Sequence, residues 1–310
     1  DNGLGTGSLE VDTAGGNVSV ANVQGNQTIT ALSGTVTGAG SARVNVSAGK
    51  TLTVNQASNT AFAGNVALAG GATTGSGAVL SQTGGGTLTL SGVPTLGNNS
   101  SLQVSAGSVK IAATTGSPSV GSGVTANVSG TGSLELAGSV SALGTTTAAN
   151  RANITNTSSA AAGLLVSAGN HQVGGIDGPG TTQVNAGASL TANHIVQGAL
   201  VIGGTSSSPA TVTIDASDAS GNPLVATSGA VILSSGSASD PIAESSLGTS
   251  GLSDLASNSS TSLAGSPSVS SSSPLAAGGT SAVPEPSTIL LSLLASAGAL
   301  AAVRRRKVAR

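Results

Sequence analysis

The sequence LSQTGGGTLTLSG (Leu80–Gly92), followed by SLQVSAGSVKI (Ser101–Ile111), shows the pattern that decides the fold. Apolar Leu, Val and Ile alternate with Thr, Ser and Gln, and glycines separate the alternating runs. Alternation with a period of two is typical of a half-buried β-strand, and glycine permits the positive-φ bend between two strands. The two segments therefore predict short strands joined by tight glycine corners.

Similar alternating runs recur along most of the chain before residue 234. They are SLEVD (8–12), NVSVANV (17–23), QTITAL (27–32), RVNVSAG (43–49), TLTVN (51–55), SLELAG (133–138), ALVIGG (199–204) and ATVTIDA (210–216). No stretch before residue 284 has an apolar period of 3.6 over the length of a helix. The pattern predicts an all-β body over residues 1–233.

A short repeat indicates how these strands are arranged. The tetrad Val-Ser-Ala-Gly begins at Val46, Val104 and Val166, and a Val-Asn-Ala-Gly variant begins at Val184. The starts are 58, 62 and 18 residues apart. These spacings are close to three, three and one turns of a coil of about 20 residues, as in a repeat protein whose units stack.

One coil of this length has too few apolar residues to close a core, whereas stacked coils bury continuous aliphatic ladders. We therefore expect a β-solenoid of about ten coils. The alternative is an array of β-sandwiches, in which segments such as VSAGKTLTV (46–54) form hairpins.

The segment Leu80–Ile111 resembles the autotransporter-associated β-strand repeat. Gln82 replaces the Lys that is usual in that repeat, and the aromatic residue of the intervening loop is absent. The resemblance implies a right-handed parallel β-helix of the kind found in secreted passenger and adhesin proteins.

Composition and charge narrow the classes of function. The chain has 310 residues, 6% of them charged, one Phe (Phe62) and no Cys, Met, Trp or Tyr. Before Arg304, four basic residues face eleven acidic ones, a net charge of −7. Nucleic-acid binding needs clustered Lys and Arg, so we expect no nucleic-acid partner.

Absence of Cys suits an exported protein without disulfides, although a cytosolic chain can share it. The chain begins at Asp1 without a leader, so we expect that a signal peptide is missing from this sequence.

Serine dominates residues 234–282, which also contain Pro241, Pro267 and Pro274. This composition is typical of a flexible, disordered linker. Heavy O-glycosylation of the serines is the alternative interpretation.

The C-terminal sequence SAVPEPSTILLSLLASAGALAAVRRRKVAR (281–310) has three parts. The turn Pro284-Glu285-Pro286 cannot lie inside a helix. Residues 288–303 are apolar and uncharged and predict a helix of about 24 Å, just short of a hydrocarbon core of about 30 Å. The basic end, Arg304, Arg305, Arg306, Lys307 and Arg310, should stay in the cytoplasm.

This order of parts, from 283 to 310, resembles the PEP-CTERM sorting signal of Gram-negative bacteria. By that resemblance the sorting motif is Val283, Pro284, Glu285, Pro286 and Ser287, and the basic stop is Arg304, Arg305, Arg306 and Lys307. The resemblance implies processing by an exosortase, a temporary inner-membrane anchor at 288–303, and delivery to the cell surface or extracellular matrix. An ordinary tail anchor and a buried apolar helix are the alternatives.

Residues that could carry chemistry are few. His171, His194 and Asp177 are close enough in sequence for a metal site to be considered, but we expect isolated, solvent-facing or loop side chains. Asp215 and Asp218 could supply oxygens to calcium, but a turn with Asx hydrogen bonds is the preferred interpretation. We predict no catalytic residue, no cofactor and no metal.

The sequence therefore favours an exported, non-enzymatic structural protein of the cell surface or biofilm matrix, with exopolysaccharide as a partner. An adhesin that binds cells or surfaces is the second hypothesis. A β-helix enzyme that degrades polysaccharide, with Asp177 or Asp215 taking part in catalysis, is the third.

Overall fold

The computed structural model describes residues 6–205, 207–215, 225–227, 231–235 and 260–264. The chain divides into two compact units, residues 1–268 and 269–310, and every described residue belongs to the first. The predicted apolar helix at 288–303 and most of the predicted linker lie outside the described residues.

The described part is all-β, and its only helical segment is the 3₁₀ turn η1 (Ala148–Asn150). The strands are β1 (Ser8–Glu10), β2 (Val18–Val23), β3 (Gln27–Ile29), β4 (Ala31–Ser33), β5 (Ser41–Val46), β6 (Thr51–Val54), β7 (Thr60–Phe62), β8 (Asn65–Leu68), β9 (Val79–Gln82), β10 (Thr87–Leu90), β11 (Thr95–Leu96), β12 (Ser101–Val104), β13 (Ser108–Ile111), β14 (Ser119–Val120), β15 (Thr125–Val128), β16 (Ser133–Leu136), β17 (Asn153–Asn156), β18 (Leu164–Val166), β19 (Asn170–Gln172), β20 (Gly175–Val184), β21 (Ser189–Ala192), β22 (His194–Thr205), β23 (Ser208–Pro209), β24 (Thr211–Asp215), β25 (Val225–Thr227), β26 (Val231–Ser235) and β27 (Ser260–Ala264).

Successive strands belong to successive faces of a stack of coils. Face 1 runs through β3, β6, β9, β12, β15, β17, the start of β20, the start of β22, and β25. Face 2 runs through β7, β10, β13, β16, β18, the end of β20, the end of β22, and β26. Face 3 consists of β2, β5, β8, β11 and β14, and further along the stack of β19, β21 and β24.

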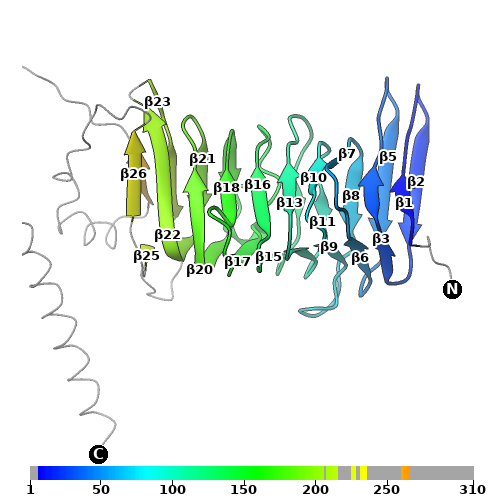
Figure 1. The fold of residues 1–310 in the computed structure, drawn as a ribbon, viewed down its shortest axis with the longest axis horizontal. Coiled ribbons are helices and arrows are strands. Elements are labelled where there is room, and N and C mark those ends of the chain that lie inside the picture. Colours follow the sequence, from blue (N-terminus) through cyan, green and yellow to red (C-terminus); the bar gives the residue numbers. More distant parts are fainter. Residues whose placement is uncertain (1–5, 206, 216–224, 228–230, 236–259, 265–310) are drawn as a thin grey trace, which may run out of the picture. The chain divides into compact units, whose positions relative to one another are not determined.

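Within these three faces every pairing is parallel, and Figure 1 shows the strands of the stack side by side in sequence order. The arrangement is consistent with the predicted β-solenoid. Strands joined by a Val-Ser-Ala-Gly corner do not pair with each other: β5 pairs with β2 and β8, whereas β6 pairs with β3 and β9. The hairpins required by the β-sandwich alternative are therefore absent at this corner. Inside the serine-rich range, β27 pairs with β24 in antiparallel orientation.

The coils vary in length and do not keep to the predicted length of about 20 residues. Register partners are 18 residues apart between Thr181 and Ala199, and 31 apart between Leu200 and Val231. The paired strand segments change little, so loops absorb most of the variation. One such loop, between β16 and β17, contains η1.

The glycine corners are confirmed, whereas the predicted spacing in whole turns is wrong for the first two intervals and right for the last. The glycines that end the four tetrads all have positive φ: Gly49 (+68°), Gly107 (+61°), Gly169 (+78°) and Gly187 (+75°). However, the first tetrad follows face 3, the second follows face 1, and the last two follow face 2. Only Val166 and Val184 are register partners. The tetrad is a local turn motif that joins one strand to the next, and it occurs at each of the three corners.

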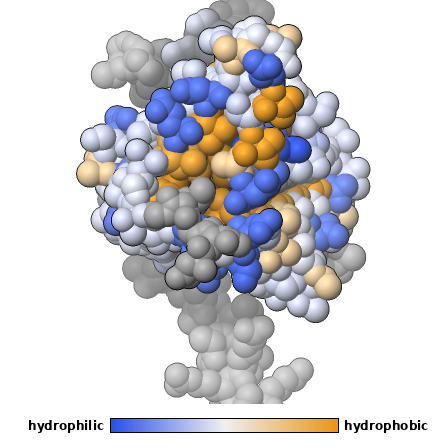
Figure 2. Space-filling view, turned by 90° about the vertical axis from the view of Figure 1, so that its right-hand side faces the viewer, coloured by the Kyte–Doolittle hydropathy of each residue, from blue (hydrophilic) through white to orange (hydrophobic). Residues whose placement is uncertain are grey.

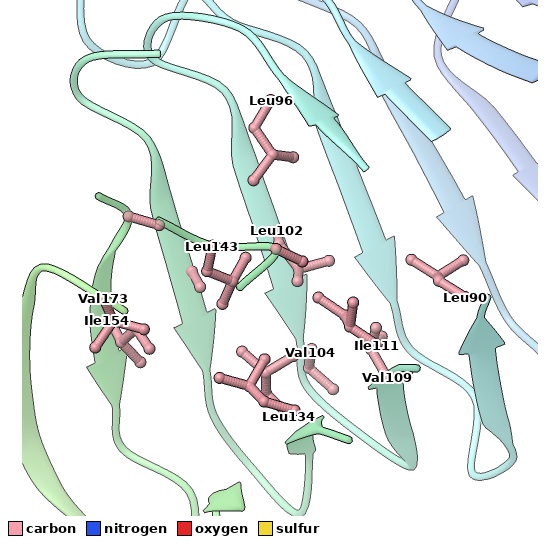
Figure 3. Close-up of a cluster of buried hydrophobic side chains, with 14 of the residues drawn as sticks. Leu90, Leu96, Leu102, Val104, Val109, Ile111, Leu134, Leu143, Ile154 and Val173 are labelled. Atoms are coloured by element: carbon pink, nitrogen blue, oxygen red, sulfur yellow. The ribbon is translucent and has the colours of Figure 1, made fainter. Parts of the chain in front are cut away.

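The core is built from aliphatic ladders inside the coils. Side chains alternate between buried and outward along each strand, as in β10, β13 and β16. One ladder on face 2 joins Phe62, Leu90, Ile111, Leu136, Val166, Val184 and Ile202 by direct register. Figure 3 shows part of the core between neighbouring coils. Each ladder member covers the one before it, which is how short strands exclude water.

At the end of the stack nearest the N-terminus, part of the apolar interior is visible at the surface. In Figure 2, apolar atoms gather at the centre of this end and polar atoms surround them. The large apolar side chains most exposed in the described residues, Val18 (68%) and Val20 (46%), lie on β2, at the edge of face 3.

Candidate functional site

The outward side of face 1 carries a regular array of uncharged polar side chains. Strands β6, β9, β12, β15 and β17 pair in continuous register, and the residue after each strand continues the ladder through its backbone N–H. We call the outward positions of these five coils the polar grid. They are Thr51, Thr53, Asn55, Val79, Ser81, Thr83, Ser101, Gln103, Ser105, Thr125, Asn127, Ser129, Asn153, Thr155 and Thr157.

The polar grid contains no charged residue, and Val79 is its only apolar one. Ser101 is engaged within it: Thr125 Oγ1 donates to Ser101 Oγ at 3.1 Å, and Asn127 Nδ2 donates to the same oxygen at 3.3 Å. By contrast, the side chains of Thr53, Gln103 and Thr155 make no hydrogen bond to any residue that the structure describes. Their hydrogen-bonding groups remain available at the surface.

Asp177 and His194 lie beyond the grid on the same face. Asp177 follows Thr155 in register, and His194 Nε2 lies 3.1 Å from each carboxylate oxygen of Asp177. A Cβ on Gly175 would lie 2.2 Å from the Cε1 atom of His194, so the absence of a side chain there makes room for the imidazole ring. The prediction that these side chains are isolated is wrong for this pair.

His171 is also not solvent-facing as predicted. It lies on β19 of face 3 and is 2% exposed, and its Nε2 atom lies 2.9 Å from the Ala168 carbonyl oxygen. Burial lowers the pKa of His171 below the usual value, against the opposing effect of hydrogen bonds to backbone groups. The two histidines lie on different faces, and no group of three or more potential metal ligands occurs in the described part of the chain.

Asp215, considered as a calcium ligand, forms an ion pair with Arg151. Arg151 Nη1 lies 3.3 Å from Asp215 Oδ2 and donates to Asn193 Oδ1 at 2.8 Å. Arg151 Nε donates to the Thr145 carbonyl at 3.0 Å, and only 3% of the Arg151 side chain is exposed. This arginine therefore links the loop after β16 to corners two and three coils further on. Asp218 lies outside the described residues.

A third pair occurs on face 2, where Lys110 and Glu135 are register partners. Lys110 Nζ donates to Glu135 Oε1 at 2.8 Å, and Ser167 Oγ donates to the same oxygen at 2.7 Å. Burial alone would raise the pKa of Glu135, but these hydrogen bonds and the charge of Lys110 outweigh it and hold the pKa below its usual value. Face 2 therefore carries charges where the grid on face 1 carries none.

No pattern in the sequence indicates the polar cluster that lies inside the core. Asn156 Nδ2 donates to Gln197 Oε1 at 3.0 Å, and Thr182 Oγ1 donates to the same oxygen at 3.2 Å. All three side chains are buried. They lie where β20 bends between Gly178 and Thr181, and they supply partners for backbone groups at this sharp corner, such as the Gly178 carbonyl, which accepts from Gln197 Nε2. The cluster is structural.

One small apolar cavity lies in the described core. It measures about 10 Å³, room for about one water molecule, and is lined by residues such as Leu80, Leu102 and Ile111. An organic substrate does not fit there.

The predicted sorting motif, Val283 to Ser287, and the basic stop, Arg304 to Lys307, lie outside the described residues. Among the residues that are described, no helix has the length and apolar character needed to cross a membrane.

Residues 282–307 match the PEP-CTERM protein-sorting motif. The match includes every residue of the predicted motif and of the basic stop, and it leaves out only residues 308–310 of the predicted signal. No match to a curated protein or to a solved structure was found. The motif implies that the protein is exported and processed at the membrane by an exosortase-type enzyme.

Proposed function

We propose that the protein is a non-enzymatic structural component of the cell surface or extracellular matrix of a Gram-negative-type bacterium. The observation that carries this proposal is the sorting motif at 282–307, because export through an exosortase-type enzyme places the body outside the cytoplasm. In this proposal residues 288–303 hold the chain in the inner membrane until processing, and residues 234–282 act as a linker.

The body supports a structural role. We propose that its parallel coils form a right-handed β-helix related to the autotransporter-associated repeats, since right-handed connections between parallel strands are strongly favoured. Such a stack satisfies its backbone hydrogen bonds internally and presents long, regular outer faces. The polar grid on face 1 gives this surface many hydroxyl and amide groups that can contact matrix exopolysaccharide through individually weak hydrogen bonds.

An adhesin is the second candidate, favoured by the exposed Val18 and Val20 on face 3, which offer an apolar contact to a protein surface. A polysaccharide-degrading enzyme has less support. Glycoside cleavage generally uses two carboxyl groups that flank one bond, whereas Asp177 is paired with His194 and Asp215 with Arg151.

The proposal is tested by following the protein in its native host after replacement of Glu285 by alanine. We expect the E285A chain to stay with the inner-membrane fraction, because the motif that the processing enzyme reads is changed. A matched variant, Ser281→Ala, lies just outside the matched residues and should reach the surface fraction like the wild type. Equal surface delivery of wild type and E285A would contradict the proposal.

A further inference from the structure

We propose that the polar grid on face 1 binds a neutral polysaccharide whose chain lies along the stacking axis, across the coils from β6 to β17. This inference rests on the proposed matrix function and assigns to it a surface and a class of ligand.

Register gives the grid its spacing. The five strands pair without a bulge, so Thr53, Ser81, Gln103, Asn127 and Thr155 form one straight row. Neighbouring members of the row are about 4.8 Å apart, and residues two apart along one strand are about 7 Å apart. The step between coils is close to the length of one sugar residue in an extended polysaccharide. A chain along the stacking axis can therefore meet a new polar side chain at each sugar.

Within that row, available side chains alternate with side chains that are either buried or hydrogen-bonded to a neighbour. Thr53, Gln103 and Thr155 make no hydrogen bond to a described residue, whereas Asn127 donates to Ser101, and Ser81 is only 9% exposed. Available groups thus recur every second coil, about 10 Å apart. A polysaccharide whose successive sugars alternate in orientation presents the same hydroxyl edge at every second sugar, which matches this repeat.

Charge decides between neutral and acidic polymers. The grid has no charged side chain. The charges nearest to it are Lys50, before β6, Asp177, on the coil after β17, and Arg151, before β17, whose side chain is only 3% exposed and is paired with Asp215. The chain before Arg304 has a net charge of −7, so it repels a polyanion at long range. A uronic-acid polymer would also find no row of cations here. A neutral, hydroxyl-rich chain needs only the donors and acceptors that the grid supplies.

The face also explains how binding can occur without aromatic platforms. The only aromatic side chain, Phe62, is buried. Each hydrogen bond therefore contributes little by itself, and affinity depends on the number of contacts made along the polymer at once. Long chains should bind measurably, and short oligosaccharides should bind far more weakly.

The test uses the full chain in a polyoxyethylene detergent, which carries no sugar, and matrix polysaccharide from the host, separated by anion exchange into neutral and acidic fractions. The grid variant is Thr53→Val, Gln103→Leu and Thr155→Val. The control variant makes the same kinds of change on the outward sides of faces 2 and 3: Thr89→Val, Gln183→Leu and Thr191→Val. Equal melting temperatures of the two variants establish that both are folded.

We expect affinity electrophoresis to show retardation of the wild type by the neutral fraction. The grid variant should lose at least about tenfold in affinity, since each lost hydrogen bond is worth about fivefold, and the control variant should bind like the wild type. Equal binding of the grid variant, or preferential binding of the acidic fraction by the wild type, would overturn this inference and leave the matrix function standing. Absence of binding to both fractions would instead remove the proposed matrix contact itself.

Discussion

At the scale of single residues, a few buried charged and polar side chains make contacts between coils that the sequence pattern does not reveal. The pattern identifies which residues alternate, but it does not show that Arg151 reaches Asp215, because the two are 64 residues apart in the chain. The same holds for Asn156 and Gln197, which occupy positions where the alternation leads one to expect apolar side chains. Their partners exist only once the coils are stacked.

His171 should make stability depend on pH. Its pKa in the folded protein is lowered by burial, so the unfolded chain binds its proton more readily. The contribution of His171 to stability is therefore fully present above its pKa in the unfolded chain, about 6.5. It is lost as the pH falls from there through the lower pKa of the folded protein. Chemical denaturation between about pH 7.5 and 5 should show this loss in the wild type and not in His171→Leu.

As a control, His194→Asn leaves His171 in place and should retain the loss. A His171→Leu variant with the same pH dependence as the wild type would contradict the assignment.

Glu135 should make stability depend on pH in a separate, more acidic range. Its folded pKa is lowered by Lys110 and Ser167 despite the burial that raises it. Its contribution is therefore present above the unfolded value, about 4.3, and is lost as the pH falls through the folded value. Glu135→Gln should reduce the acid sensitivity of denaturation in this window and leave the window of His171 unchanged. Glu10→Gln serves as the matched control on β1, and an equal effect of the two changes would argue against this origin.

Arg151 is expected to matter more than its position in a loop suggests. Its removal in Arg151→Ala leaves the Asp215 carboxylate and the Thr145 carbonyl without their partner, and should lower the free energy of unfolding by about 3 kcal/mol. Asp215→Asn keeps a polar group and should cost about 1 kcal/mol. Urea denaturation measures both. If Arg151→Ala costs no more than Lys50→Ala, a control that removes a half-buried lysine without an ion pair to a described residue, the proposed link between coils is absent.

At the scale of elements, the strands and the glycine corners are largely predictable, because both depend on local sequence. The alternating runs coincide with strands such as β6, β10 and β12, and the tetrad glycines adopt the expected positive φ. The assignment of corners to faces is not predictable from the tetrads, since the same local turn suits all three corners. Coil length is equally hidden, because loops such as 143–150 change it without changing the strands.

Two glycine corners separate the cost of backbone strain at positive φ from the cost of steric crowding between neighbouring coils. Gly107 has a φ of +61°, and a Cβ placed there would lie 2.3 Å from the Gly86 carbonyl oxygen of the neighbouring coil. Gly75 has a φ of +79°, but a Cβ there would meet nothing within 4 Å. Gly75→Ala should therefore cost about 1 kcal/mol from φ alone, and Gly107→Ala about 3 kcal/mol or more. Equal costs in urea denaturation would mean that the coils do not approach as closely as described.

At the scale of the whole molecule, the account joins a stack of parallel coils to a C-terminal sorting motif. The motif was predictable because its parts stand in a fixed order at one end of the chain, whereas a binding partner of the body leaves no comparable signature in the sequence. The outer faces narrow the class of partner only through charge, because the polar grid carries none whereas face 2 carries Lys110 and Glu135. The partner must therefore be established by binding, and the place of action by processing.

The central claim is that this body is delivered outside the cell by its C-terminal motif. It is tested most directly by intact-mass and C-terminal peptide mass spectrometry of the protein recovered from the surface fraction of its native host. We predict a mature C-terminus near Pro284 to Ser287, with the apolar segment 288–303 and the basic stop removed. A chain from that fraction that still ends at Arg310 would contradict the claim and would identify the C-terminal segment as a plain membrane anchor.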